Sequence, residues 1–214
     1  MSSYIPTKEE EERETWYKKN RSEQYEFCMH MTESMKGGKN VVIAEAKVKS
    51  GKKDMAIILY LIIKKDESLN SKTKIYFASA LHRTADMTQR EELRNWLGQN
   101  NVYSVNNLKM QKKFIKEIQT SQRNGFQIYI LLDELDYGSK KGQLLSKIWK
   151  LVQDNPNDIK AVGFSATPQE SLTEHIKPPK NISQEHLTYE PSDNYYGAEK
   201  YIEDGRYKQA QPFF

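Results

Sequence analysis

The chain has 214 residues, of which 29% are charged and 37% are hydrophobic, and its formal net charge is +4 at pH 7. This length suits one substantial domain with flanking segments. The longest apolar run, residues 55–63, is about half the length of a membrane span, so a membrane protein is not expected. The single cysteine, Cys28, excludes an internal disulfide and a cysteine-rich zinc site. It also fits a reducing, intracellular location.

Two helices are predicted ahead of the first strand. Thr7 and Glu10 have the spacing of a capping box, which predicts a helix from near Lys8 through Lys19. A second helical pattern follows residues 20–21 and ends at the Gly37-Gly38 pair. We therefore assign residues 1–38 to an N-terminal helical extension.

Strands and helices then alternate with short connections. Strands are predicted at 40–45, 74–80, 102–105, 127–132 and 158–164, each of the first four being followed by a helical pattern. This alternation predicts an α/β fold with a mostly parallel central sheet flanked by helices, over residues 39–190. Trp16, Trp96 and Trp149 stand at helical spacing with other apolar residues, which favours core packing for all three. Residues 191–214 form an irregular Tyr-rich tail, preceded by a strand-like piece around 186–189.

The strand at 127–132 runs directly into acidic residues, in the sequence QIYILLDELDYG. A continuous apolar run suits a strand that is buried on both faces of a parallel sheet. Carboxylates at the carboxyl end of such a strand lie where α/β proteins bind ligands. Asp133 and Glu134 therefore have a Walker B arrangement, with the aspartate placed for Mg²⁺ and the glutamate for a water. The alternative is a strand that ends in an acidic turn with no ligand.

A candidate phosphate loop, AKVKSGKK, occupies residues 46–53, between a predicted strand and a predicted helix. Such loops bind phosphate through backbone N–H groups, a helix N-terminus and a lysine. Gly51 and Lys52 fit the usual pattern, whereas Ala46 replaces its first glycine and Lys53 replaces its hydroxyl residue. The alternative interpretation is a lysine-rich surface turn.

Lys53 is the most serious departure from the phosphate-loop pattern. The hydroxyl at this position normally ligates Mg²⁺, and an ammonium group has only donors and carries the same sign of charge as the metal. Three consequences remain open: the metal is held by Asp133 and water, Lys53 partly replaces the cation, or hydrolysis is lost while binding persists.

The order of these features resembles that of the first RecA-like domain of superfamily 2 helicases and nucleic-acid translocases, over about residues 15–190. Gln24 precedes the loop, S-G-K-K forms it, Asp133-Glu134 closes a buried strand, and S-A-T-P at 165–168 follows the next strand. The S-A-T-P tetrapeptide is the most specific part of the resemblance. It argues against a third possibility, an unrelated P-loop enzyme such as a nucleotide kinase.

The resemblance implies ATP and Mg²⁺ as cofactors. Gln24 is similar to the glutamine that reads the adenine edge, and Lys52 to the lysine that reaches the phosphates. Asp133 is similar to the metal ligand and Glu134 to the residue that activates the attacking water. The implied nucleotide-binding set is Gln24, Lys49, Ser50, Gly51, Lys52 and Lys53.

The resemblance also implies a nucleic-acid partner, for which we favour DNA over RNA. Ser165 and Thr167 are similar to the residues that couple nucleotide state to the grip on nucleic acid. Ser79, His82 and Arg83 fall where the family contacts the sugar–phosphate backbone. Separately, four lysines at 109, 112, 113 and 116 form a charged helix face, which is either solvated or a phosphate contact.

The family needs a second RecA-like lobe, and no chain remains for one after Tyr195. The sequence therefore suggests either a fragment of a longer helicase or a one-lobed relative that borrows its partner or has lost activity. Two functions stay open: an ATP-dependent motor lobe, and a catalytically degenerate module that binds protein or nucleic acid.

Overall fold

The computed structural model of the chain describes residues 4–46, 50–66, 72–79, 84–105, 107–133, 143–166 and 177–190. Its helices are α1 (Lys8–Asn20), α2 (Ser22–Lys36), α3 (Lys52–Lys65), α4 (Thr84–Leu97), α5 (Leu108–Arg123) and α7 (Gln143–Asp154), with a short 3₁₀ turn at Gln99–Asn101. Its strands are β1 (Val41–Ala46), β2 (Thr73–Ser79), β3 (Val102–Ser104), β4 (Gln127–Asp133), β5 (Ile159–Ser165) and β6 (Gln184–Tyr189). The Tyr-rich tail at 191–214 lies outside the described residues.

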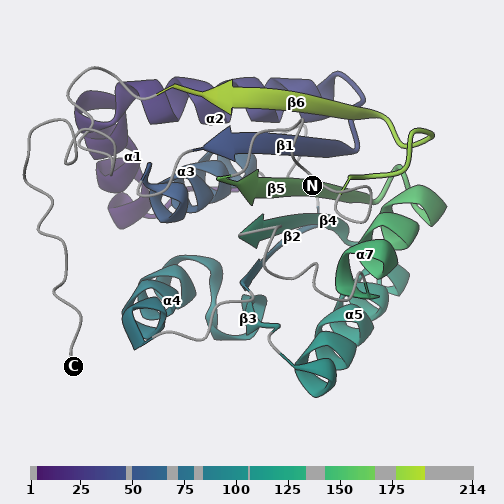
Figure 1. Cartoon of the computed structure of the whole chain (residues 1–214). Coiled ribbons are helices and arrows are strands. Elements are labelled where there is room, and N and C mark those ends of the chain that lie inside the picture. Colours follow the sequence, from purple (N-terminus) through teal and green to yellow (C-terminus); the bar gives the residue numbers. More distant parts are fainter. Residues whose placement is uncertain are drawn as a thin grey trace, which may run out of the picture.

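The six strands form one sheet in the order β3-β2-β4-β5-β1-β6, and every neighbouring pair is parallel. The arrows of β6, β1, β5 and β4 accordingly point the same way in Figure 1. The predicted α/β fold with a parallel, helix-covered sheet is confirmed, and the arrangement is consistent with a RecA-like P-loop domain. The chain leaves β1 through α3 toward β2, yet β1 itself lies between β5 and β6. In such open sheets, ligands bind outside the carboxyl ends of the strands where connections diverge in this way.

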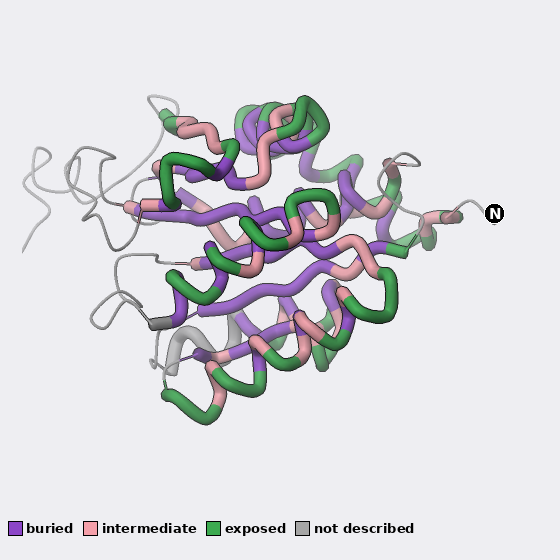
Figure 2. Tube along the Cα trace, turned by 90° about the vertical axis from the view of Figure 1, so that its right-hand side faces the viewer, coloured by how far each residue is buried: buried purple, intermediate pink, exposed green. Residues whose placement is uncertain are grey.

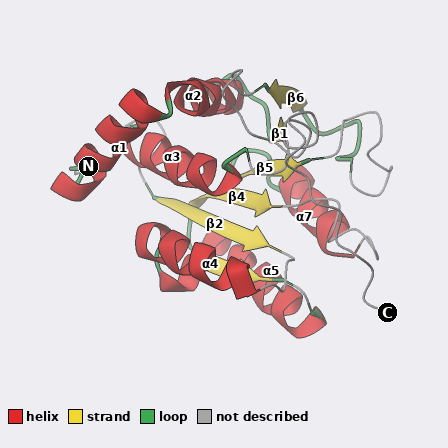
Figure 3. Ribbon diagram, turned by 60° about the vertical axis from the view of Figure 1, so that its left-hand side comes forward, coloured by secondary structure: helices red, strands yellow, loops and turns green. Residues whose placement is uncertain are grey.

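Helices cover both faces of the sheet, so the strands are buried on both sides (Figures 2 and 3). Alternate strand residues enter two separate cores: Val42 and Ala44 pack with α1 to α4, while Val41 and Ile43 pack with α5 and α7. The apolar run at 55–63 is buried apart from Tyr60, because α3 packs against the sheet, α2 and α4. Within the described ranges, no helix has the length and apolarity that a bilayer crossing requires.

The predicted start of α1 is confirmed in detail. Thr7 Oγ1 accepts from the Glu10 backbone N–H at 3.2 Å, and Glu10 Oε2 accepts from the Thr7 N–H at 2.7 Å. This capping box satisfies two backbone donors that the helix leaves without an internal partner. One prediction for α1 is wrong: Trp16 is 44% exposed rather than in the core, because α1 is the outermost helix of its layer. Trp149 is buried as predicted, and Trp96 is partly buried against the core.

Glu14 joins α1, α2 and α3 through one buried carboxylate. It accepts hydrogen bonds from the Tyr25 hydroxyl at 2.6 Å, the Lys18 ammonium at 2.7 Å and the Lys65 ammonium at 2.8 Å. Burial by itself would raise the pKa of Glu14, but the bonds from Lys18, Lys65 and Tyr25 outweigh it and lower that pKa from 4.5 to about 2. The carboxylate therefore stabilises the fold in its charged form.

Because the folded-state pKa lies below the unfolded one, this stabilisation is complete above pH 4.5 and is lost as the pH falls toward 2. We expect Glu14→Gln to lower the free energy of unfolding by about 1–3 kcal/mol at pH 7. Denaturant unfolding at several pH values should show that the difference in free energy of unfolding between the variant and the parent disappears between pH 4.5 and 2. Glu12→Gln, at an exposed ion pair with Lys8, is the matched control. A gap of constant size down to pH 2 would contradict the role assigned to Glu14.

Candidate functional site

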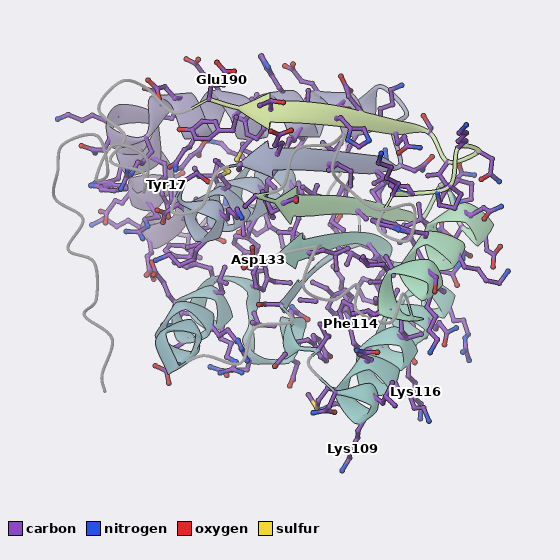
Figure 4. The ribbon with its side chains drawn as sticks, viewed as in Figure 1. Tyr17, Lys109, Phe114, Lys116, Asp133 and Glu190 are labelled. Carbon is purple, nitrogen blue, oxygen red and sulfur yellow. The ribbon has the colours of Figure 1, made fainter. Side chains whose placement is uncertain are left out.

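The carboxyl ends of the strands bring the predicted site residues to one edge of the sheet. Ser79 ends β2, Asp133 ends β4 and Ser165 ends β5. Ser79 is directly opposite Asp133, and Glu45 of β1 is directly opposite Ser165. Asp133 lies at the arrowhead end of its strand in Figure 4. β4, which ends in Asp133, and β1, which leads into the candidate phosphate loop, therefore both end on the same side of the sheet, with β5 between them.

The loop ends in the geometry that a phosphate-binding helix requires. Gly51 has φ +82°, in the left-handed region that favours glycine, and α3 begins at the next residue, Lys52. The N-cap residue is Gly51 itself, which has no side chain, so the described part of the loop provides no side-chain cap hydrogen bond from this position. The first N–H groups of a helix lack internal acceptors and carry a partial positive charge. The start of α3 therefore has the polarity that suits an anion, and Lys52 is its first residue.

Gln24 reaches the loop from α2. Its side chain is 4% exposed, and Nε2 donates to the Ser50 carbonyl oxygen at 2.5 Å. Gln24 Oε1 and the Ser50 hydroxyl are also buried, and neither has a hydrogen-bond partner among the described residues. Gln24 therefore holds the loop in place and keeps one acceptor uncommitted beside it. The predicted adenine contact stays a prediction.

A side chain at Gly51 would have to displace the end of the Gln24 side chain. A methyl group there would overlap Gln24 Nε2, whereas a methyl group at Gly125, which also has a positive φ of +74°, would meet nothing within 4 Å. We expect Gly125→Ala to cost about 1–2 kcal/mol from backbone strain alone. Gly51→Ala should cost more, because Gln24 must also move. Denaturant unfolding of both variants measures the difference, and equal losses would show that Gln24 does not restrain the loop.

Lys53 makes its ion pair on α4. Its ammonium lies 2.5 Å from Glu92 Oε2, and Arg13 of α1 donates to the other oxygen of Glu92 at 2.9 Å. An ammonium cannot act as a metal ligand. The hydroxyl ligand that phosphate loops usually provide is therefore missing at this position, and the side chain that replaces it is held toward α4.

Asp54, the next residue of α3, also lies near Gly51. The sequence did not predict its contact with Tyr17. Its Oδ1 accepts from the Tyr17 hydroxyl at 3.1 Å, and its Oδ2 would lie 3.6 Å from a methyl group at Gly51. Burial and the charge of Asp54 both raise the pKa of Tyr17, so the phenol stays protonated and keeps donating. Figure 4 shows Tyr17 on the same side of the molecule as Asp133. Residues 37 apart in sequence have no local pattern that would predict this contact.

The structure does not place every predicted site residue. Ser79 and Ser165 are both 0% exposed, so they are buried at the carboxyl ends of β2 and β5 and do not reach the protein surface. The remaining predicted residues lie outside the described ranges and stay predictions: Lys49, His82, Arg83, Glu134 and Thr167. Among the described residues, no cluster of three or more histidine, cysteine, aspartate or glutamate side chains could hold a metal ion.

No protein-family model matches the chain, and no curated protein does. Among solved structures, the cytoplasmic domain of EssC is similar, with 13% identity and a TM-score of 0.48 over 72% of this chain and 31% of that one. EssC ATPases 2 and 3 from Geobacillus thermodenitrificans give 12% identity and a TM-score of 0.46, over 65% of this chain and 30% of that one. The Aeropyrum pernix ORC1 protein in complex with DNA gives 18% identity and a TM-score of 0.49, over 86% of this chain and 47% of that one.

The chain therefore spans less than half the length of each of these three structures. Their TM-scores all lie below 0.5, so the likeness identifies no function for this chain. Its function has to be inferred from the residues at the sheet edge.

Proposed function

We propose that the chain is an ATP-binding lobe of a superfamily 2 helicase-like protein that acts on nucleic acid. The observation that carries this proposal is the shared edge of the sheet. The left-handed Gly51 and the start of α3 follow β1, and Asp133 ends β4 at the same edge. A helix N-terminus with a lysine at its first residue suits the phosphates of a nucleotide.

Each residue has a distinct role in this proposal. Lys52 pairs with the terminal phosphates, and Gln24 holds the loop against them. A carboxylate oxygen is a ligand that Mg²⁺ prefers, so Asp133 fits the metal, whereas Lys53 does not. When bound, Mg²⁺ would neutralise charge on the phosphates during hydrolysis, and Glu134 would orient the attacking water.

A titration with a fluorescent ATP analogue tests this proposal. We expect saturable binding with a dissociation constant between about 1 μM and 1 mM, the usual range for enzyme substrates. Unlabelled ATP should compete, and inorganic sulfate at the same concentration should not. Absence of saturable binding up to millimolar concentrations, both with and without Mg²⁺, would refute nucleotide binding.

The ion pair between Lys53 and Glu92 supports a second candidate, a degenerate module that no longer hydrolyses ATP. Replacing Lys53 by threonine restores the missing hydroxyl and separates the two candidates. If Lys53→Thr creates ATP turnover that the parent lacks, the domain is a retired ATPase. If the parent already hydrolyses ATP when nucleic acid is present, the module interpretation fails.

The proposed nucleic-acid partner is supported by α5. Four lysines within its first nine residues are exposed, and none has an ion pair with a described residue: Lys109, Lys112, Lys113 and Lys116. Figure 4 shows Lys109 and Lys116 pointing away from the sheet. Like charges three or four residues apart on a helix oppose its formation by a few tenths of a kcal/mol, and Lys109 also lies in the first turn, where the helix end is positive. Repulsion among the four lysines does not favour the helix, whereas a chain of phosphates would be attracted to this charge.

The segment that leads into α5 starts at the carboxyl ends of the strands, as the proposed nucleotide site does. The Val105 N–H, just ahead of α5, donates to the Ser79 carbonyl at 2.9 Å, and Ser79 lies opposite Asp133. We expect Lys112→Glu combined with Lys113→Glu to weaken binding of single-stranded DNA at least about tenfold at low salt. If both lysines contact phosphates, the slope of log binding constant against log salt concentration should become shallower by about 1–2.

Fluorescence anisotropy over a salt series provides the measurement, with a DNA and an RNA oligonucleotide of the same sequence. Lys19→Glu combined with Lys180→Glu changes the net charge equally at two exposed lysines outside α5 and is the matched control. Equal losses in both double variants would show that only net charge matters and would remove α5 from the interface.

A further inference from the structure

Lys53, which replaces the hydroxyl residue that normally binds the metal, belongs to a network of three charged side chains. Lys53 and Arg13 bind the two different oxygens of Glu92, at 2.5 and 2.9 Å. The three side chains are only about one third exposed or less, at 29% for Lys53, 34% for Glu92 and 32% for Arg13. The network connects α1 and α4 to the first turn of α3, which is the turn that faces the proposed phosphates.

Arg13 is the fixed part of this network. Its guanidinium lies 5.0 Å from the ring centre of Tyr17, 5.3 Å from that of Trp16 and 5.9 Å from that of Trp96. Cations are held over aromatic faces at such distances. Glu92 would therefore keep a charged partner if the Lys53 ammonium moved away.

Lys53 is the mobile part, because a lysine carries its charge on a flexible four-carbon stem. It follows Lys52 directly at the start of α3, and the backbone there already favours an anion. A polyphosphate at this site would therefore meet two adjacent ammonium groups. A divalent metal at the usual position would instead meet a like charge where it normally finds an oxygen ligand.

We propose that this site binds a nucleoside polyphosphate free of Mg²⁺, with the Lys53 ammonium leaving Glu92 to neutralise the phosphates where the metal otherwise would. This inference rests on the proposed nucleotide-binding function and specifies the ionic form of its ligand. It concerns binding alone. Hydrolysis would still require the metal that Asp133 is placed to hold.

Titration of the fluorescent ATP analogue in excess EDTA and in excess Mg²⁺ tests the inference. We expect the parent to bind the metal-free form at least as tightly as the Mg²⁺ form. Lys53→Thr should weaken metal-free binding at least about tenfold and make binding depend on Mg²⁺. Glu92→Gln should tighten metal-free binding about threefold to tenfold, because the carboxylate charge no longer competes for Lys53.

Lys65→Thr removes an ion-paired lysine from the far end of the same helix and is the matched control. It should leave the ratio of the two affinities unchanged, and thermal melts should confirm that each variant is folded. Parent binding that requires Mg²⁺ would overturn the inference and leave the proposed function standing. Metal-free binding that Lys53→Thr does not alter would also overturn it. Absence of binding under both conditions would refute the proposed function itself.

Discussion

Replacing Phe114 by alanine is expected to lower the free energy of unfolding by about 3–5 kcal/mol, the usual cost of truncating a fully buried aromatic side chain. Phe114 lies on the buried face of α5 and is 0% exposed. Its ring centre is 4.9 Å from that of Tyr103 and 6.2 Å from that of Tyr76, the latter in an edge-on arrangement. The cavity would open between α5, β2 and β3, where the surrounding strands have little freedom to collapse.

Leu108 is the matched control for this prediction. It lies on the same helix and is 57% exposed, so Leu108→Ala should change stability by no more than about 0.5 kcal/mol. Denaturant unfolding followed by circular dichroism measures both variants. If Phe114→Ala does not fold, Phe114→Leu should show an intermediate loss. A loss below about 1 kcal/mol for Phe114→Ala would mean that α5 contributes little to this core.

The parts of the fold that follow from local pattern were predictable from the sequence. β4 is a run of apolar residues because it lies between β2 and β5 and is covered on both faces, and this leaves a clear signal along the chain. The capping box at Thr7 is equally local. The predicted strand at 158–164 is observed at Ile159–Ser165, a shift of one residue that does not affect the topology.

The position of β6 was less predictable. It is an edge strand with four partly buried residues, the exposed Thr188 and the buried Tyr189, so the sequence signals its existence around 186–189 but not its partner. Its pairing with β1 joins residues more than 130 positions apart, as in Val41 with Gln184. Parallel pairing at such a distance depends on the whole chain connectivity and leaves no pattern within either strand.

The charged network at the start of α3 shows the same limit for the site. Sequence reasoning identified Lys53 as a departure from the phosphate-loop pattern but not its partner, because Glu92 is 39 residues away and Arg13 is 79 residues from Glu92. A surface helix has many glutamates and arginines, and only the packing of α1 and α4 beside α3 selects this pair. The chemistry of single residues was therefore predictable, whereas their contacts required the fold.

Replacing Glu134 by glutamine is expected to reduce ATP turnover by about 10²–10⁴-fold, the usual contribution of a positioned general base. Glu134 lies outside the described residues; in the sequence it follows Asp133, the last residue of β4. The substitution removes the negative charge that would orient or deprotonate the attacking water and keeps the size of the side chain. Binding of the ATP analogue should stay within about twofold of the parent, because phosphate contacts come mainly from Lys52 and the start of α3.

Turnover should be measured with and without single-stranded DNA, since an arginine finger, where one is supplied, raises turnover by about 10³–10⁵-fold. Glu190→Gln is the matched control, because Glu190 is an exposed glutamate just after β6, at the same edge of the sheet (Figure 4). Unchanged turnover in Glu134→Gln would remove that residue from the mechanism. A parent with no turnover at all would favour the degenerate module, in which the acidic strand end persists after Lys53 has replaced the metal-binding hydroxyl.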